Sequence, residues 1–297
     1  MRLVLVGLYI LFLVVIFIVK RAFWTPDLIF AGLFVLFALL GQGKSFAVRF
    51  LPFVLLLLSY EKLRSLASYL NKHVHYLGMP HFDQWLFHGV LPTAWLQQHF
   101  YHGHIGPLDM YFYFLYTLHF VTPLLLAVAI WKAQPKQYWF YMTSLLVLSY
   151  AGFITYVLFP AAPPWLASDL HLIQPIHHLS SDIWGAFGVK NFSEYYNHLS
   201  ANLVAAMPSL HAAYPTLFAL MVRKIWGTRW FIISLVYPIS IWVGVVYLGE
   251  HYVADVLAGI VYAIASYLAA PWVLKQCSKL VAMVNKHTGN VLLKWSR

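Results

Sequence analysis

The sequence predicts an all-α fold, a polytopic bundle of membrane helices, and three observations lead to this prediction. Of the 297 residues, 62% are hydrophobic and 9% are charged, whereas soluble domains carry about 25% charged residues. The apolar residues form runs of roughly 20, the length that a helix needs to cross a bilayer. The Lys and Arg residues gather in short loops between these runs. A soluble fold could not bury so much apolar surface, so we expect lipid to cover it.

The apolar runs predict eight membrane passes, at about residues 2–19, 25–41, 46–70, 107–131, 137–159, 207–226, 229–248 and 252–274. The first run exceeds the apolar core of about 7–15 residues in a signal peptide, so we interpret it as a retained anchor. We expect N-terminal transmembrane helices in residues 1–45, a six-helix catalytic domain in residues 46–275 and a basic tail in residues 276–297. Residues 71–106 and 161–205 form longer connections, and the aromatic residues of the former suit a helix lying in the membrane interface.

The charges predict the orientation of the chain. An even number of passes puts both termini on one side, and most of the 19 basic residues but none of the 9 acidic ones then lie there. The positive-inside rule makes that side cytoplasmic. Residues 71–106 and 161–205 then face a periplasm, lumen or exterior. Since topology explains the basic excess and no basic aromatic patch occurs, we expect no nucleic-acid partner.

Metal or disulfide chemistry finds little support in the sequence. The lone cysteine, Cys277, excludes a disulfide framework and a cysteine-based metal cluster. The spacing of His99, His102 and His104 could bind a metal, but no His-Glu-x-x-His arrangement occurs. We interpret these histidines as interfacial polar residues and predict no metal site.

The first candidate motif is Met207-Pro208-Ser209-Leu210-His211, which directly precedes an apolar run. Proline suits the first helical position, because its missing N–H would be unpaired there. Ser209 and His211 would then occupy the first turn, where free backbone N–H groups and the positive helix end favour an anion such as phosphate. The alternative is a helix cap with a satisfied histidine.

The second candidate motif pairs His251 with Asp255, four residues apart and therefore on one helical face. A carboxylate at this spacing can accept the N–H of one imidazole nitrogen and leave the other as nucleophile or base. The alternative is a structural pair, although ionisable groups at membrane depth are usually functional. The chain crosses the bilayer twice between His211 and His251, so both return to the same outer face.

Four other residues are candidates for contacts with substrate. Trp165 follows a proline-rich exit from the fifth pass and would be either an interfacial anchor or a wall of a lipid site. Asp109, Tyr116 and His119 fall near one face of the fourth pass. We favour a buried polar network for these three, with contact to substrate as the alternative.

The two motifs resemble those of a known family. Pro208-Ser209-Leu210-His211 and His251-x-x-x-Asp255 resemble the second and third motifs of the type-2 phosphatidic acid phosphatase superfamily. Phe159-Pro160-Ala161-Ala162-Pro163-Pro164-Trp165 and the Asp109, Tyr116 and His119-Phe120 pattern resemble the branch of the aureobasidin-sensitive inositol phosphorylceramide synthases and their bacterial relatives. The resemblance covers roughly residues 107–260 and implies a six-helix bundle, here with about two additional N-terminal helices.

The resemblance also implies a mechanism. His251 would be the nucleophile, oriented by Asp255, and His211 would protonate the departing oxygen, with Pro208 and Ser209 beside the phosphate. A phosphohistidine would pass its phosphoryl group to a lipid hydroxyl in a transferase or to water in a phosphatase. No metal or organic cofactor is implied, since positioned donors and cations meet the phosphoryl charge.

The chain departs from the superfamily pattern at three cationic positions. Gly152 and Phe159 stand where the first motif has Lys and Arg, and Val245 stands where the third has Arg. Our candidates for phosphate-binding cations are Lys62, Arg64 and Lys72, at the outer end of the third pass.

These departures favour a synthase-like lipid phosphotransferase, whose partners would be a phospholipid donor and a lipid acceptor in the bilayer. The alternatives are a lipid phosphate or pyrophosphate phosphatase and a non-enzymatic transporter. The sequence predicts no particular oligomeric state.

Overall fold

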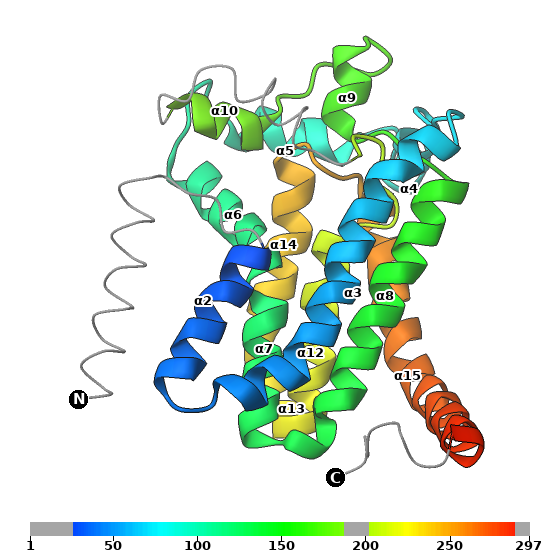
Figure 1. Cartoon of the computed structure of the whole chain (residues 1–297). Helices are drawn as coiled ribbons and strands as arrows, with labels where there is room; N and C mark the ends of the chain where they lie inside the picture. Colours follow the sequence, from blue (N-terminus) through cyan, green and yellow to red (C-terminus); the bar gives the residue numbers. More distant parts are fainter. Residues whose placement is uncertain (1–25, 187–201, 289–297) are drawn as a thin grey trace.

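The computed structural model describes residues 26–186 and 202–288 and shows a bundle of long helices with short helices across one end (Figure 1). The bundle comprises α2 (Pro26–Leu39), α3 (Gly43–Leu70), α6 (Pro107–Thr117), α7 (Thr122–Ala133), α8 (Tyr138–Leu158), α12 (Leu210–Trp226), α13 (Thr228–Ser234), α14 (Val236–Tyr247) and α15 (Val253–Thr288). The end helices are α4 (Gly78–Leu86), α5 (Pro92–Phe100), α9 (Pro164–Asp169) and α10 (Leu179–Ala186). The described part of the chain has only isolated β-bridges besides these helices and two short 3-10 turns, η1 (Leu118–Phe120) and η2 (Pro135–Gln137). The predicted all-α fold is therefore confirmed.

Three described helices are long and apolar enough to cross a membrane: Pro135–Leu158, Thr228–Tyr247 and Val253–Leu280. A fourth crossing results if α6 and α7 form one span, bent by 54° between them. The chain is thus an integral membrane protein. The expected passes over 25–41 and 207–226 correspond to shorter helices, α2 with 14 residues and α12 with 17, and the expected pass over 2–19 lies outside the described residues.

The bend between α6 and α7 corrects the continuous helix expected over 107–131. The chain passes through η1, which contains His119, before α7 begins at Thr122. Pro123 lies in the first turn of α7, where its missing N–H is tolerated but a continuing helix would lose a hydrogen bond. His119 therefore lies at a break in the helix.

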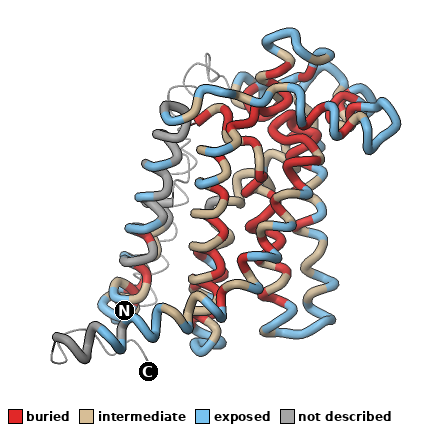
Figure 2. Tube along the Cα trace, turned by 90° about the vertical axis from the view of Figure 1, so that its right-hand side faces the viewer, coloured by how far each residue is buried: buried red, intermediate tan, exposed pale blue. Residues whose placement is uncertain are grey.

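The buried residues run through the middle of the bundle (Figure 2). Aromatic rings tie α3 to its neighbours: Phe50 lies 5.8 Å from Trp131 of α7 and 5.4 Å from Tyr138 of α8, between ring centroids. The outward faces are apolar as well, with Leu158, Val236 and Leu268 between 68% and 72% exposed. Such surfaces suit contact with lipid tails.

The two ends of the bundle differ in chemistry. At one end lie α4, α5, α9 and α10 (Figure 1), with exposed Phe82, Trp85 and Trp95 on α4 and α5, as expected for interfacial helices. The other end holds the tight turns between α2 and α3, α7 and α8, and α12 and α13. The basic residues in these turns and in the adjoining helix ends are Lys44, Lys132, Lys136, Arg223, Lys224 and Arg229.

Candidate active site

The start of α12 positions His211. Ser209 is the N-cap, with φ −70° and ψ 108°, and its Oγ accepts the N–H of Ala212 at 3.2 Å. The expectation that Pro208 occupies the first helical position is therefore wrong: α12 begins at Leu210, since the extended Ser209 caps it. His211 remains in the first turn, while the Ser209 hydroxyl, expected to contact phosphate, serves as the cap.

The start of α15 positions Asp255. The helix begins at Val253, so His251 precedes it. The expectation that His251 and Asp255 share one helical face is therefore wrong. The Asp255 carboxylate folds back and accepts the N–H of Tyr252 at 2.9 Å. Asp83 of α4 accepts the N–H groups of Val253 at 2.8 Å and of Ala254 at 2.9 Å. Two carboxylates thus satisfy N–H groups that a helix start leaves unpaired.

Asp83 is fully buried against this helix end. Burial raises the pKa of Asp83 to about 6, although the hydrogen bonds from Val253 and Ala254 act to lower it. A carboxyl with this pKa changes its charge near pH 6. We therefore expect the cap of α15 to respond to pH in this range.

The two helix starts bring the three expected residues together. His251 Nε2 lies 3.2 Å from His211 Nδ1, and His251 Nδ1 lies 3.6 Å from Asp255 Oδ2. The backbone N–H of Ser209 donates to the carbonyl of Asp255 at 3.0 Å. A Cβ on Gly259 would lie 2.3 Å from the Ser209 carbonyl oxygen, so only glycine allows this approach of α15 to α12. One nitrogen of His251 therefore faces a carboxylate and the other faces His211.

Aromatic rings flank His211. The Tyr116 ring stacks on it with 4.3 Å between centroids, and the His119 ring lies at 4.2 Å. Asp109 is placed differently: it accepts the N–H of Gly106 at 2.6 Å and the hydroxyl of Tyr247. Of the three residues for which we expected a buried polar network, only Asp109 fits it, because its bonds join α6 to α14. Tyr116 and His119 instead lie beside His211.

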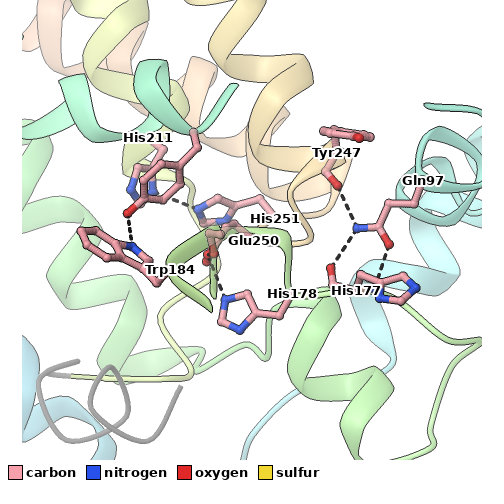
Figure 3. A network of polar contacts seen from close by, with 10 residues as sticks. Gln97, His177, His178, Trp184, His211, Tyr247, Glu250 and His251 are labelled. Carbon is pink, nitrogen blue, oxygen red and sulfur yellow. Dashed lines mark hydrogen bonds and ion pairs between the residues drawn. The ribbon is translucent and has the colours of Figure 1, made fainter. Parts of the chain in front are cut away.

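Glu250 forms a second polar cluster beside His251 (Figure 3). Its Oε1 accepts His178 Nε2–H at 3.1 Å and the hydroxyl of Ser180. Burial acts to raise the pKa of Glu250, but the charge of His178 and the two hydrogen bonds hold it below its usual value. Trp165, 5% exposed, stacks on His178 with 4.4 Å between centroids. This burial does not fit a membrane anchor and places Trp165 in the cluster.

The three positions that lack the family's cations are filled by packing. A Cβ on Gly152 would lie 3.2 Å from Leu210, Phe159 stacks on His75 at 3.8 Å, and Val245 is buried.

The three proposed cations are not brought to the site by any described contact. Lys72 is exposed, and no described side-chain contact joins it to the histidines. Lys62 and Arg64 belong to α3, but their side chains lie outside the described residues. Their role in phosphate binding stays a prediction.

Sequence reasoning missed several residues that support the site. Asp83, Gln97, His178 and Glu250 contact partners between 72 and 171 residues away in the chain, a separation that no local spacing reveals. The signal available was the scarcity of acids: with only nine in the chain, Asp83 in an apolar segment and Glu250 beside a motif histidine were conspicuous.

Comparison with known proteins identifies the family of the chain. The model of the PAP2 superfamily matches residues 78–269, which include both histidines, Asp255 and the capping Asp83. A phosphoinositol dihydroceramide synthase of Bacteroides thetaiotaomicron is 31% identical over 258 residues, covering 82% of this chain and 83% of the relative. No solved structure matches the chain. The chain belongs to the PAP2 superfamily, in its inositol phosphorylceramide synthase-like branch, and is an integral-membrane phosphotransferase.

Proposed function

We propose that the protein moves a phosphorylated head group, such as inositol phosphate, from a phospholipid to a lipid hydroxyl through a phosphohistidine on His251. The observation that carries the proposal is the placement of His251 between Asp255 and His211. The name of the Bacteroides relative, a phosphoinositol dihydroceramide synthase, supports phosphoinositol as head group and dihydroceramide as acceptor.

In the first half-reaction, His251 Nε2 attacks phosphorus and the bond to the diacylglycerol oxygen breaks. The Asp255 carboxylate, 3.6 Å from Nδ1, favours the tautomer with its proton on Nδ1, which leaves Nε2 unprotonated, and it stabilises the charge that develops on the ring. His211, 3.2 Å from Nε2 in the resting site, gives its proton to the departing oxygen. General acid catalysis of this kind contributes about 10²–10⁴-fold.

In the second half-reaction, the acceptor hydroxyl attacks the same phosphorus and the P–N bond breaks. His211 takes the hydroxyl proton, which restores the protonation state of the resting enzyme. The rings of Tyr116 and His119 beside His211 limit its rotation, so that one nitrogen stays directed at the reacting oxygen.

We also propose that the end carrying the site faces a periplasm, lumen or exterior, with both termini cytoplasmic. The basic turns at the opposite end support this orientation. Cys277, exposed on α15, should then resist a membrane-impermeant thiol reagent in intact cells and react after permeabilisation. Rapid labelling of intact cells would contradict the orientation.

The direct test of the transfer reaction uses purified protein with head-group-labelled phosphatidylinositol and dihydroceramide. We expect label to appear in a phosphoinositol dihydroceramide, and His251→Ala to abolish that product. Release of water-soluble label alone would indicate the phosphatase alternative. Full activity in His251→Ala would indicate that the chemistry lies elsewhere.

A further inference from the structure

A segment of the outer loops lies directly on the turn that carries His251. We call residues 164–184 the outer strap and residues 247–251 the catalytic turn. Gly249 has φ +82°, and a Cβ there would lie 2.7 Å from the carbonyl oxygen of His177. The N–H of Trp165 donates to the Gly249 carbonyl and that of Leu179 to the Leu248 carbonyl, each at 3.2 Å. The strap therefore rests on the backbone of the turn.

Gln97 of α5 anchors the strap from the side (Figure 3). Its Nε2 donates to the carbonyls of His177 at 2.9 Å and Tyr247 at 2.8 Å, and its Oε1 accepts the N–H of His177 at 2.8 Å. The side chain is 5% exposed. One buried amide thus ties the strap to the end of α14.

Glu250 provides a second anchor from within the turn. Its carboxylate holds His178 and Ser180 of the strap, and Trp165 stacks on the His178 ring. Since Glu250 directly precedes His251, the strap is fastened next to the proposed nucleophile.

The far part of the strap reaches the other histidine. Trp184 Nε1–H donates to the hydroxyl of Tyr113, whose ring lies 6.1 Å from that of Tyr116. Tyr116 stacks on His211, and a dashed line in Figure 3 marks the hydrogen bond that Trp184 donates. The strap therefore extends from the turn of His251 to the surroundings of His211. Beneath it His251 is 5% exposed.

We propose that the outer strap decides between transfer and hydrolysis by keeping water from the phosphohistidine, with Gln97 and Glu250 as positioning residues. This inference rests on the proposed phosphohistidine. In hydrolysis, a water oxygen attacks phosphorus, the P–N bond breaks, His211 takes a water proton, and inositol phosphate leaves. In transfer, a lipid hydroxyl takes the place of water in the same steps. Because the two reactions differ only in the nucleophile, access of water decides the product.

The test is the ratio of hydrolysis to transfer in purified protein given labelled phosphatidylinositol and dihydroceramide. Gln97→Ala removes three anchoring bonds and Ser180→Ala removes one. The matched control is His177→Gln, whose ring is exposed and lies against Tyr101, while its backbone keeps both bonds to Gln97. We expect the share of inositol phosphate to rise about tenfold in Gln97→Ala, less in Ser180→Ala, and not in His177→Gln. Partial unfolding would lower both products and leave their ratio unchanged.

The outcomes separate this inference from the proposed function. If the wild type transfers the head group and every variant shows the same ratio of hydrolysis to transfer, the proposed role of the strap is wrong and the proposed transferase activity is unaffected. A wild type that only hydrolyses, with faster hydrolysis in the strap variants, overturns transfer and supports water exclusion. The absence of any acid-labile phosphoenzyme in the wild type overturns both.

Discussion

The starts of α12 and α15 each bring a histidine to the same site, but they are held in different ways. The start of α12 is capped locally by Ser209, and His211 lies inside the helix. The start of α15 receives Asp83 from 170 residues away, and His251 lies in a turn before the helix, under the outer strap. The helix start that carries the proposed acid is therefore capped by local sequence, whereas the one beside the proposed nucleophile is capped by a tertiary contact.

This difference suits the two chemical roles. His211 must meet a donor oxygen and later an acceptor oxygen, and its ring is only partly buried. His251 must hold one tautomer and exclude water, and it is 5% exposed between the Asp255 carboxylate and His211. Tertiary contacts provide that fixation, at the cost of dependence on distant residues.

Among variants at the two helix starts, we expect the largest loss of transfer activity from Asp255→Asn. The amide oxygen can keep the bond from Tyr252, but its NH2 group favours the wrong His251 tautomer. By analogy with the aspartate of hydrolase triads, kcat should fall about 10⁴-fold with little change in thermal stability. The measurement is head-group transfer beside thermal unfolding in detergent. A loss below about tenfold would make Asp255 a helix cap only.

Gly259→Ala should disturb both helix starts at once. The added Cβ would lie 2.3 Å from the Ser209 carbonyl oxygen, and relieving such a clash costs about 1–3 kcal/mol of stability. Thermal unfolding measures the loss. In α10, a Cβ on Gly185 meets nothing within 4 Å, so Gly185→Ala is the control. Equal stability of the two variants would mean that α12 and α15 separate easily.

Much of this arrangement could be predicted from the sequence. Apolar runs indicated the helices, and two crossings between His211 and His251 required both to return to one end. The break at Pro123 also had a visible signal, although we expected a continuous helix. The capping by Asp83 and the anchoring by Gln97 could not be predicted, because those contacts form only when distant segments pack.

Asp83→Asn should change the pH dependence of the α15 start. Burial raises the pKa of Asp83 from 3.8 to about 6, so the folded protein binds more protons than the unfolded chain between these values. The contribution of Asp83 to stability therefore decreases as pH rises through this window and stays low above it. The measurement is thermal unfolding at about pH 4.5, inside this window, and at about pH 7.5, above it. Between these two conditions the wild type should lose more stability than the variant. Parallel losses in both proteins would contradict the prediction.

The smallest effect should come from Ser209→Ala. Losing this N-cap costs about 1 kcal/mol of stability, while His211 keeps its place within the first turn. We expect a small decrease in unfolding temperature and transfer activity within about tenfold of the wild type. A greater loss of activity without further loss of stability would indicate that the Ser209 hydroxyl contacts the phosphate.

The central claim is that His251 is the nucleophile and His211 the acid, and trapping the intermediate tests it most directly. Protein mixed briefly with phosphate-labelled phosphatidylinositol, without acceptor, is quenched in alkali and digested for peptide mapping. We expect acid-labile label on His251, absent from His251→Ala and discharged from the wild type by added dihydroceramide. Label on His211, or label on His251 that acceptor lipid does not remove, would contradict it.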